Sequence, residues 1–369
     1  MTTRRQFVLG ASTFAVLGLS SPAFAMPHKR LVLVILRGGL DGLAALVPHG
    51  DRSHRRVRGD AAVLEALDLD GFYGLNPALE PLLPLWRAGQ LAPVTAVGLP
   101  WSERSHFSAQ DLLEAGTDRH TRDGWLSRAL ARAGGEGLAI GKGLPLVLRG
   151  EGEATSFEPK LKLKSEQEFL AEVATLYDAD PILGPPFRKG LETRMELDAL
   201  LGEARKGRST DLTVLRTLAA LLREPDGPAV AVVEVGGWDT HSQQENRLRN
   251  GLGALAEGLV LLSEELRERW ADTMVVAVSE FGRTVRANGT GGTDHGTGGA
   301  ALVAGGSVAG GRVLGGWPGL DDLFEGRDLP VTTDVRSLFK GAIQAQLGLG
   351  PARLDEVFPD SAGALPLRL

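Results

Sequence analysis

Short loops that combine carboxylates, imidazoles and glycines recur along this sequence, and these residue types suit metal binding or ester hydrolysis. The GGWDTH segment contains Asp239 and His241, and the GTDHGT segment contains Asp294 and His295. An Asp beside a His on a loop can also be a turn or cap residue, but flanking glycines let a ligand approach the backbone. The candidate cofactor is a divalent metal ion, with zinc, manganese, calcium and magnesium left open, and the alternative is that no cofactor binds. The candidate metal ligands are Asp41, Asp239, His241, Glu280, Asp294 and His295.

A second motif, ERSHFSAQD over residues 103–111, places a serine just before a predicted helix. Ser105 is a candidate nucleophile, because a helix N-terminus stabilises an anion such as phosphate or sulfate. His106 is the nearest candidate base. Two structural alternatives stay open: Ser105 only caps the helix, or His106 pairs with Asp111 and orients the loop.

Two arginines, Arg37 and Arg283, follow predicted strands. A guanidinium binds phosphate or sulfate oxygens bidentately and stabilises charge on a tetrahedral transition state. The candidate catalytic residues are therefore Ser105, His106, Arg37 and Arg283. A dinucleotide site at Gly38-Gly39 is disfavoured, because the segment lacks the G-x-G-x-x-G pattern.

Alternating apolar runs and helical patterns predict the elements that position these residues. The predicted strands are 31–36, 91–97, 144–148, 229–235, 274–278 and 300–304. Leucines at steps of three and four predict helices within 212–222 and 248–266, and Thr333-Asp334 precedes a predicted helix over 338–347. Strands alternating with helices indicate a doubly wound α/β fold, whose ligand sites lie beyond the carboxyl ends of the strands.

The first 25 residues read as a signal peptide, with Arg4-Arg5, a short apolar run and an Ala23-Phe24-Ala25 processing site. We expect export by the twin-arginine machinery, cleavage after Ala25, and a periplasmic or secreted protein. The alternative is a Sec signal in which the paired arginines are accidental. Residues 26–369 are expected to form a single domain, with 151–208 as a helical and loop elaboration.

The composition excludes several classes of function. The 369-residue chain has a net charge of −6, and removing Arg4 and Arg5 with the leader makes it −6 − 2 = −8. An acidic chain without a basic cluster is a poor nucleic-acid binder. The chain contains no cysteine, which excludes thiolate metal sites and a cysteine nucleophile. We expect no transmembrane segment in the mature chain.

Five motifs in order resemble those of the exported bacterial proteins grouped as domain of unknown function 1501: LRGGLDGL, SHFSAQDLLEAGT, GGWDTH, SEFGRT and GTDHGTG. That family is similar to the alkaline phosphatase, sulfatase and cofactor-independent phosphoglycerate mutase superfamily. The resemblance implies an alkaline-phosphatase-like, mostly parallel sheet with helices on both faces. It also implies a pair of divalent metals and a Ser or Thr nucleophile.

The resemblance assigns the nucleophile to Ser105 and one metal to Asp239, His241 and His295. The second metal is in doubt, because Arg37 stands where the superfamily has an Asp at the end of the first strand. Asp41 could replace that Asp only if its loop bends back. A further departure is Glu280-Phe281, which stands in place of an Asp-His pair.

Two functions therefore compete. The first is an exported hydrolase of a small-molecule phosphate or sulfate ester, with one divalent metal and a serine nucleophile. The second is a catalytically degenerate protein that binds an anion or a protein partner of the bacterial envelope.

Overall fold

The structure is a computed structural model that describes residues 29–141, 143–157, 210–224 and 227–368, with short pieces between 173 and 188. The predicted leader and most of the predicted 151–208 elaboration lie outside the described residues. No helix in these described segments is both long and apolar enough to cross a membrane.

A central sheet of eight strands organises the chain, in the order β11-β5-β10-β9-β1-β8-β6-β7. All neighbouring strands pair in parallel except β10, which is antiparallel to both β5 and β9. The strands are β1 (Arg30–Leu36), β5 (Leu91–Gly98), β6 (Gly137–Ile140), β7 (Ala154–Phe157), β8 (Val230–Val235), β9 (Thr273–Val278), β10 (Gly299–Ala304) and β11 (Thr333–Asp334). A small second sheet pairs β2 (Leu46–Val47), β4 (Gly74–Leu75) and β3 (Leu67–Asp68).

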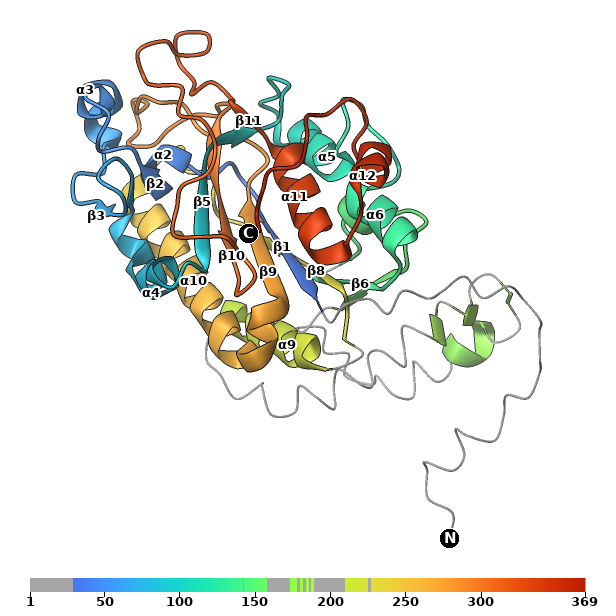
Figure 1. The fold of residues 1–369 in the computed structure, drawn as a ribbon. Helices are drawn as coiled ribbons and strands as arrows, with labels where there is room; N and C mark the ends of the chain where they lie inside the picture. Colours follow the sequence, from blue (N-terminus) through green and yellow to red (C-terminus); the bar gives the residue numbers. More distant parts are fainter. Residues whose placement is uncertain are drawn as a thin grey trace.

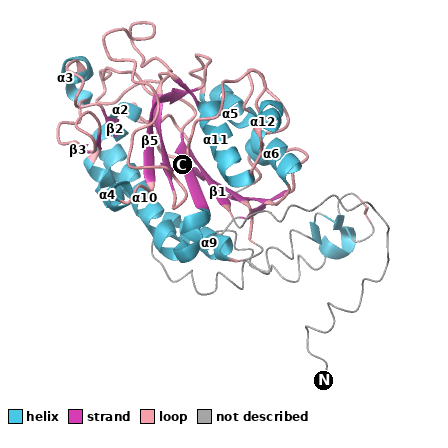
Figure 2. Cartoon of the chain, viewed as in Figure 1, coloured by secondary structure: helices cyan, strands magenta, loops and turns pink. Residues whose placement is uncertain are grey.

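Helices cover both faces of the central sheet (Figures 1 and 2). One face carries α5 (His106–Ala115), α6 (Trp125–Ala133), α11 (Val335–Leu347) and α12 (Pro351–Val357). The other carries α4 (Leu83–Arg87), α9 (Thr210–Arg223) and α10 (Gln244–Leu266). Further short helices are α2 (Gly42–Ala45), α3 (His54–Arg58), η1 (Gly59–Ala61), η2 (Pro77–Leu82), η3 (Leu146–Leu148) and η4 (Arg267–Asp272).

The central strand β1 shows why the sequence forms this layered fold. Its residues are all buried, and successive side chains enter opposite cores because a strand alternates its faces. One core contains Leu31, Leu33 and Ile35, and the other contains Val32, Val34 and Leu36. The predicted α/β class, with a mostly parallel sheet and helices on both faces, is confirmed.

Most predicted elements are present, and one is wrong. The apolar run 144–148 was expected to be a strand, but Leu146–Leu148 form the 3-10 helix η3, and β6 is the strand in this region. Proline at 145 has no backbone N–H to donate to a sheet, and a short apolar run has no periodicity that separates strand from helix. Asp334 caps α11 as expected, accepting a hydrogen bond from the backbone N–H of Arg336.

The direction of β10 decides where the site loops meet. β1, β8 and β9 are parallel, so the segments that follow them leave the same edge of the sheet. Because β10 runs the opposite way, the segment that precedes it reaches this edge as well. The loops carrying Asp239, Glu280 and His295 therefore converge, although one comes before its strand and two come after.

Candidate metal centre

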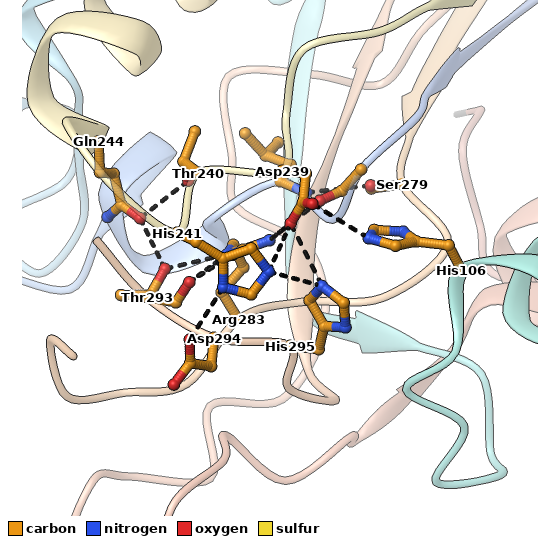
Figure 3. A network of polar contacts seen from close by, with 12 residues as sticks. His106, Asp239, Thr240, His241, Gln244, Ser279, Arg283, Thr293, Asp294 and His295 are labelled. Atoms are coloured by element: carbon orange, nitrogen blue, oxygen red, sulfur yellow. Dashed lines mark hydrogen bonds and ion pairs between the residues drawn. The ribbon is translucent and has the colours of Figure 1, made fainter. Parts of the chain in front are cut away.

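Four side chains from three segments form one polar group at this edge of the sheet (Figure 3). Ligand atoms of His106, Asp239 and His295 all lie within 4.8 Å of one another. His241 extends the group, with its Nε2 3.0 Å from Asp239 Oδ1 and 3.0 Å from His295 Nε2. His295 Nε2 lies 3.2 Å from Asp239 Oδ1, and His106 Nε2 lies 3.5 Å from Asp239 Oδ2. We call these four residues the Asp–His cluster.

Hydrogen bonds on the far side of two imidazoles fix their orientation. His295 Nδ1 lies 2.8 Å from the backbone carbonyl of Arg104, which can only accept, so Nδ1 carries the proton. His241 Nδ1 lies 2.9 Å from a carboxylate oxygen of Asp294, which also favours a proton on Nδ1. In both rings Nε2 is thereby left as a lone pair facing Asp239, the arrangement typical of metal-ligating histidines.

The third imidazole, His106, is oriented in the same way by Glu280. Its Nδ1 lies 2.9 Å from Glu280 Oε1, which also accepts from Gly38 N at 2.8 Å and from Gln110 Nε2 at 3.0 Å. Burial acts to raise the pKa of the Glu280 carboxyl, but the hydrogen bonds from Gln110 and His106 outweigh it and hold this pKa below its usual value. Glu280 is thus an ionised, fully buried acceptor behind His106, and His106 Nε2 is buried without a hydrogen-bond partner.

Arg283 adds a fixed positive charge beside the cluster carboxylate. Its buried guanidinium donates from Nη1 to Asp239 Oδ1 at 2.9 Å and to the Gly38 carbonyl at 3.0 Å, and from Nε and Nη2 to Thr293. Burial acts to raise the pKa of Asp239, but the hydrogen bond from Arg283 and the charge of His241 outweigh it, so this pKa is lowered. Asp239 is therefore held as a carboxylate.

The contact between the Nε2 atoms of His241 and His295 requires one positive charge that two neutral imidazoles do not supply. The three contacts Asp294–His241, His241–His295 and His295–Arg104 each need one proton, whereas two neutral imidazoles carry two. Either a third proton lies between the two Nε2 atoms or a cation takes its place. Burial lowers the pKa of His295, so such a proton is held weakly and a metal ion can replace it.

The geometry of the cluster fits one small divalent ion. An ion with bonds of about 2.0–2.1 Å in tetrahedral geometry places its ligand atoms roughly 3.3 Å apart. The three distances among Asp239 Oδ1, His241 Nε2 and His295 Nε2 are 3.0, 3.0 and 3.2 Å, within a few tenths of that value. Imidazole-rich donor sets suit zinc and similar ions, whereas calcium and magnesium prefer oxygen.

Three predicted ligands lie around the cluster rather than in it. Glu280 supports His106 and Asp294 supports His241, as described above. Asp41 caps α2 by accepting from Ala44 N at 3.1 Å, and its other oxygen binds Arg58 at 2.8 Å and Gln244 at 2.7 Å. The loop does not bend back, so no contact described in the structure joins Asp41 to the cluster, and the prediction that Asp41 is a ligand is corrected.

Arg37 and Asp111 also have other partners than expected. Arg37 forms ion pairs with Glu114 on α5 and Glu234 on β8. Its positive charge is therefore paired with these carboxylates and not with the cluster. Asp111 lies 3.2 Å from His120 Nδ1, so it does not pair with His106, whose Nδ1 is taken by Glu280.

Ser105 occupies the N-cap position of α5 but its side chain makes no capping hydrogen bond. The residue is exposed, and its backbone N–H donates to Glu103 Oε1 at 2.8 Å. The residues on either side both contact the cluster region, Arg104 through its carbonyl and His106 through its ring. Ser105 thus stands in the chain between two residues that contact the cluster, its hydroxyl makes no capping bond, and its role as nucleophile stays a prediction.

Phe281 packs against the cluster from the core side. Its buried ring lies with its centroid 4.9 Å from those of both His106 and His295. Gly39, at φ +75°, makes room for this ring, because a Cβ there would lie 2.4 Å from Phe281 Cε2. Phe281 offers no ligand atom and instead confines two imidazoles.

The sequence interpretation missed the residues that hold the ligands. Gln110 follows His106 by four positions on a predicted helix, so spacing alone indicates a shared face. No comparable signal identifies Arg104, which contacts His295 across 191 positions, or Arg327, whose Nη2 donates to the His295 carbonyl at 2.5 Å.

Fold and cluster together define a layered α/β protein with an imidazole–carboxylate centre at the carboxyl edge of its sheet. The family model described as "Protein of unknown function (DUF1501)" matches residues 95–358, well over half of the 369 residues. The chain belongs to this family, as the motifs predict. No curated protein matched the chain in a sequence comparison.

Solved structures similar to the chain include members of the predicted superfamily. The phosphonate monoester hydrolase of Agrobacterium radiobacter is 11% identical, with 88% of this chain and 74% of that chain covered and a TM-score of 0.41. The alkaline phosphatase from the Antarctic bacterium TAB5 is 9% identical, with 90% and 99% covered and a TM-score of 0.37. The C-terminal periplasmic domain of EcEptC from Escherichia coli, in complex with Zn, is 12% identical, with 77% and 74% covered and a TM-score of 0.40.

Proposed function

We propose that this protein is a metal-dependent hydrolase of phosphate or sulfate esters. The observation that carries this proposal is the orientation of His106, His241 and His295, each with Nδ1 committed to an oxygen and Nε2 facing Asp239. A structural role for these residues would not require three lone pairs to face one carboxylate. When bound there, a divalent ion would supply Lewis acidity toward an oxygen of the transferred group.

Ser105 is the proposed nucleophile. Its hydroxyl is exposed and unused for capping, and it stands at the N-terminus of the ten-residue helix α5. The partial positive charge at a helix N-terminus favours an anionic group, which suits a phosphate or sulfate ester. His106 was the expected base, but its place in the cluster favours a ligand role.

Arg283 would keep Asp239 ionised. Its fixed positive charge would also replace part of the electrostatic role of a second metal ion. The competing proposal, a degenerate anion-binding pocket, needs guanidinium groups that are free to bind the anion. The three nitrogens of the Arg283 guanidinium all donate within the protein, and Arg37 is paired with two carboxylates. This arrangement counts against an anion pocket built on these two arginines.

The test measures zinc and manganese bound to the purified protein, and hydrolysis of an aryl phosphate and an aryl sulfate. Ser105→Ala should abolish turnover and leave metal content unchanged. Ser108→Ala, which removes a half-buried hydroxyl near His120 in the same helix, is the matched control and should retain activity. Turnover that survives Ser105→Ala would remove the nucleophile, and a protein that takes up no metal would remove the metal centre.

Export through the twin-arginine machinery to the periplasm is part of the proposal and is supported by the Arg4-Arg5 leader. That route carries folded proteins, which suits a centre loaded with metal before export. Replacing both arginines by lysine should keep the protein in the cytoplasmic fraction and uncleaved. Unchanged export of the double variant would favour the Sec alternative.

A further inference from the structure

We propose that Asp328 is a positioning residue. It keeps His295 and the segment around Ser105 in the relative positions that metal binding requires. This inference rests on the proposed function, since it concerns the same centre. The sequence gives no reason to single out Asp328, which lies far from every motif discussed above.

The Asp328 carboxylate is completely buried and binds two arginines. Its Oδ2 accepts from Arg104 Nε at 2.9 Å and Nη2 at 2.6 Å, and its Oδ1 accepts from Arg327 Nε at 2.9 Å. Charge-assisted bonds of this length to a buried carboxylate are among the stronger interactions in proteins. Glu325 also pairs with Arg104, at 2.7 Å, but its side chain is 50% exposed and therefore contributes less.

Both arginines bind His295, one at the side chain and one at the backbone. The Arg104 carbonyl accepts from His295 Nδ1 at 2.8 Å, and Arg327 Nη2 donates to the His295 carbonyl at 2.5 Å. One buried carboxylate thus anchors two residues that contact His295, Arg104 at the imidazole through its backbone carbonyl and Arg327 at the backbone through its guanidinium. The backbone around Asp328 is itself anchored, with its N–H bound to the Phe324 carbonyl at 3.0 Å.

The same contact also positions the start of α5. Arg104 directly precedes Ser105 and His106, so fixing its guanidinium on Asp328 limits where those two residues can lie. Asp328 therefore links the proposed nucleophile segment to the ligand loop that precedes β10. Arg104 is 224 positions from Asp328 in the chain, and His295 is 32 positions from Arg327.

Replacing Asp328 by asparagine keeps the shape and removes the charge. The two arginines then lose their shared counter-charge, so Arg104, whose carbonyl accepts from His295 Nδ1, is anchored less firmly. Because the Arg104 carbonyl fixes a proton on Nδ1, His295 should lose this fixed proton position in the variant. Loss of such an outer contact typically weakens metal affinity about 10- to 100-fold.

Two readouts on the full chain test this, and neither is turnover. The first is the tautomer of His295 in metal-free protein, that is, whether Nδ1 carries its proton, read from the ¹⁵N chemical shift of that nitrogen. The second is the affinity for Co²⁺ alone, read from its visible absorption. Asp328→Asn should show a mixed tautomer and a 10- to 100-fold weaker Co²⁺ affinity.

Asp334→Asn is the matched control. Asp334 also pairs closely with an arginine, Arg336, at 2.6 Å, and it contacts no cluster residue in the described contacts. Asparagine still caps a helix, so this variant should keep the wild-type tautomer and Co²⁺ affinity. If Asp328→Asn does not fold, Arg327→Gln, at a side chain 43% exposed, should shift both readouts in the same direction by a smaller factor.

An Asp328→Asn protein with wild-type tautomer and wild-type Co²⁺ affinity would overturn the positioning role. Equal losses in Asp334→Asn would do the same, because they would indicate general destabilisation. If the wild type binds no Co²⁺, the proposed function fails, and the tautomer comparison still decides the role of Asp328.

Discussion

His241 Nε2 and His295 Nε2 face each other at 3.0 Å, from loops 54 positions apart in the chain. Each ring has its Nδ1 proton committed elsewhere, so this pair requires a shared positive charge. Such a contact is unfavourable unless a proton or cation lies near it, which makes it the most specific indication of a metal centre. The residues that enforce the contact are consequently as important as the ligands.

Asp294→Asn tests that enforcement at an exposed position. Asp294 fixes His241 through Nδ1 at 2.9 Å and its side chain is 53% exposed, so the substitution should not affect folding. Weaker orientation of His241 should lower metal affinity roughly tenfold. The measurement is a zinc titration followed by calorimetry.

Asp111→Asn supplies a matched control for that experiment. Asp111 makes the same kind of contact with His120, at 3.2 Å, and its side chain is 52% exposed. Zinc affinity should be unchanged in this variant. Equal affinities for all three proteins would mean that Asp294 does not orient a ligand.

Gly39→Ala tests whether the space around Phe281 maintains the cluster. The added Cβ would lie 2.4 Å from the Phe281 ring, and the residue has φ +75°. Gly291 has a similar φ of +73°, but a Cβ there meets nothing within 4 Å. Gly291→Ala should therefore cost only the backbone strain, about 1 kcal/mol, and Gly39→Ala about 1–3 kcal/mol more from overpacking.

Urea unfolding of both glycine variants measures these free energies, and a zinc titration reports on the cluster. Displacement of Phe281 should weaken metal binding only in Gly39→Ala. Equal unfolding free energies for the two variants would show that Phe281 moves away without cost.

The sequence predicted the layers of the fold because its strongest signals are local. The apolar run in β1 and the leucine stripe of α10 were sufficient to identify a buried strand and an amphipathic helix. The convergence of Asp239, His241 and His295 followed from the rule that sites lie at the carboxyl ends of parallel strands. The antiparallel direction of β10, which brings His295 to this edge, has no signature in the residues of the strand.

The roles of the charged residues could not be predicted, because their partners are distant in the chain. Arg37 and Arg283 both read as anion-binding groups, and the structure instead pairs each with carboxylates, as with Glu114 and Asp239. Asp41 was a candidate ligand, but in the structure its carboxylate forms an ion pair with Arg58, which lies on a separate short helix. Only the three-dimensional arrangement determines which opposite charges meet.

Phe107→Ala addresses the organic part of the substrate. Phe107 is 87% exposed in the first turn of α5, directly after His106, so it contributes little to folding. Under the proposed function, its ring would contact an aryl leaving group, and its loss should raise KM for an aryl phosphate roughly three- to tenfold with kcat unchanged. KM for methyl phosphate should not change.

Leu64→Ala is the control for Phe107, because Leu64 is 65% exposed and belongs to a different segment. It should alter KM for neither ester. An aryl-phosphate KM that is unaffected by Phe107→Ala would exclude contact between this ring and the substrate.

His54 should make the stability of the fold depend on pH. Its side chain is buried, its Nε2 has no hydrogen-bond partner, and burial together with the charge of Arg58 lowers its pKa from 6.5 to about 4. Between these two values the unfolded chain binds a proton that the folded chain does not, so stability falls as pH decreases through this window. Between pH 7 and pH 5 the loss of unfolding free energy should be roughly 2 kcal/mol.

Urea unfolding of the wild type and of His54→Gln at both pH values measures this loss, because the variant lacks the imidazole and should lose about 2 kcal/mol less. Equal losses in the two proteins would mean that His54 is not kept neutral by its surroundings.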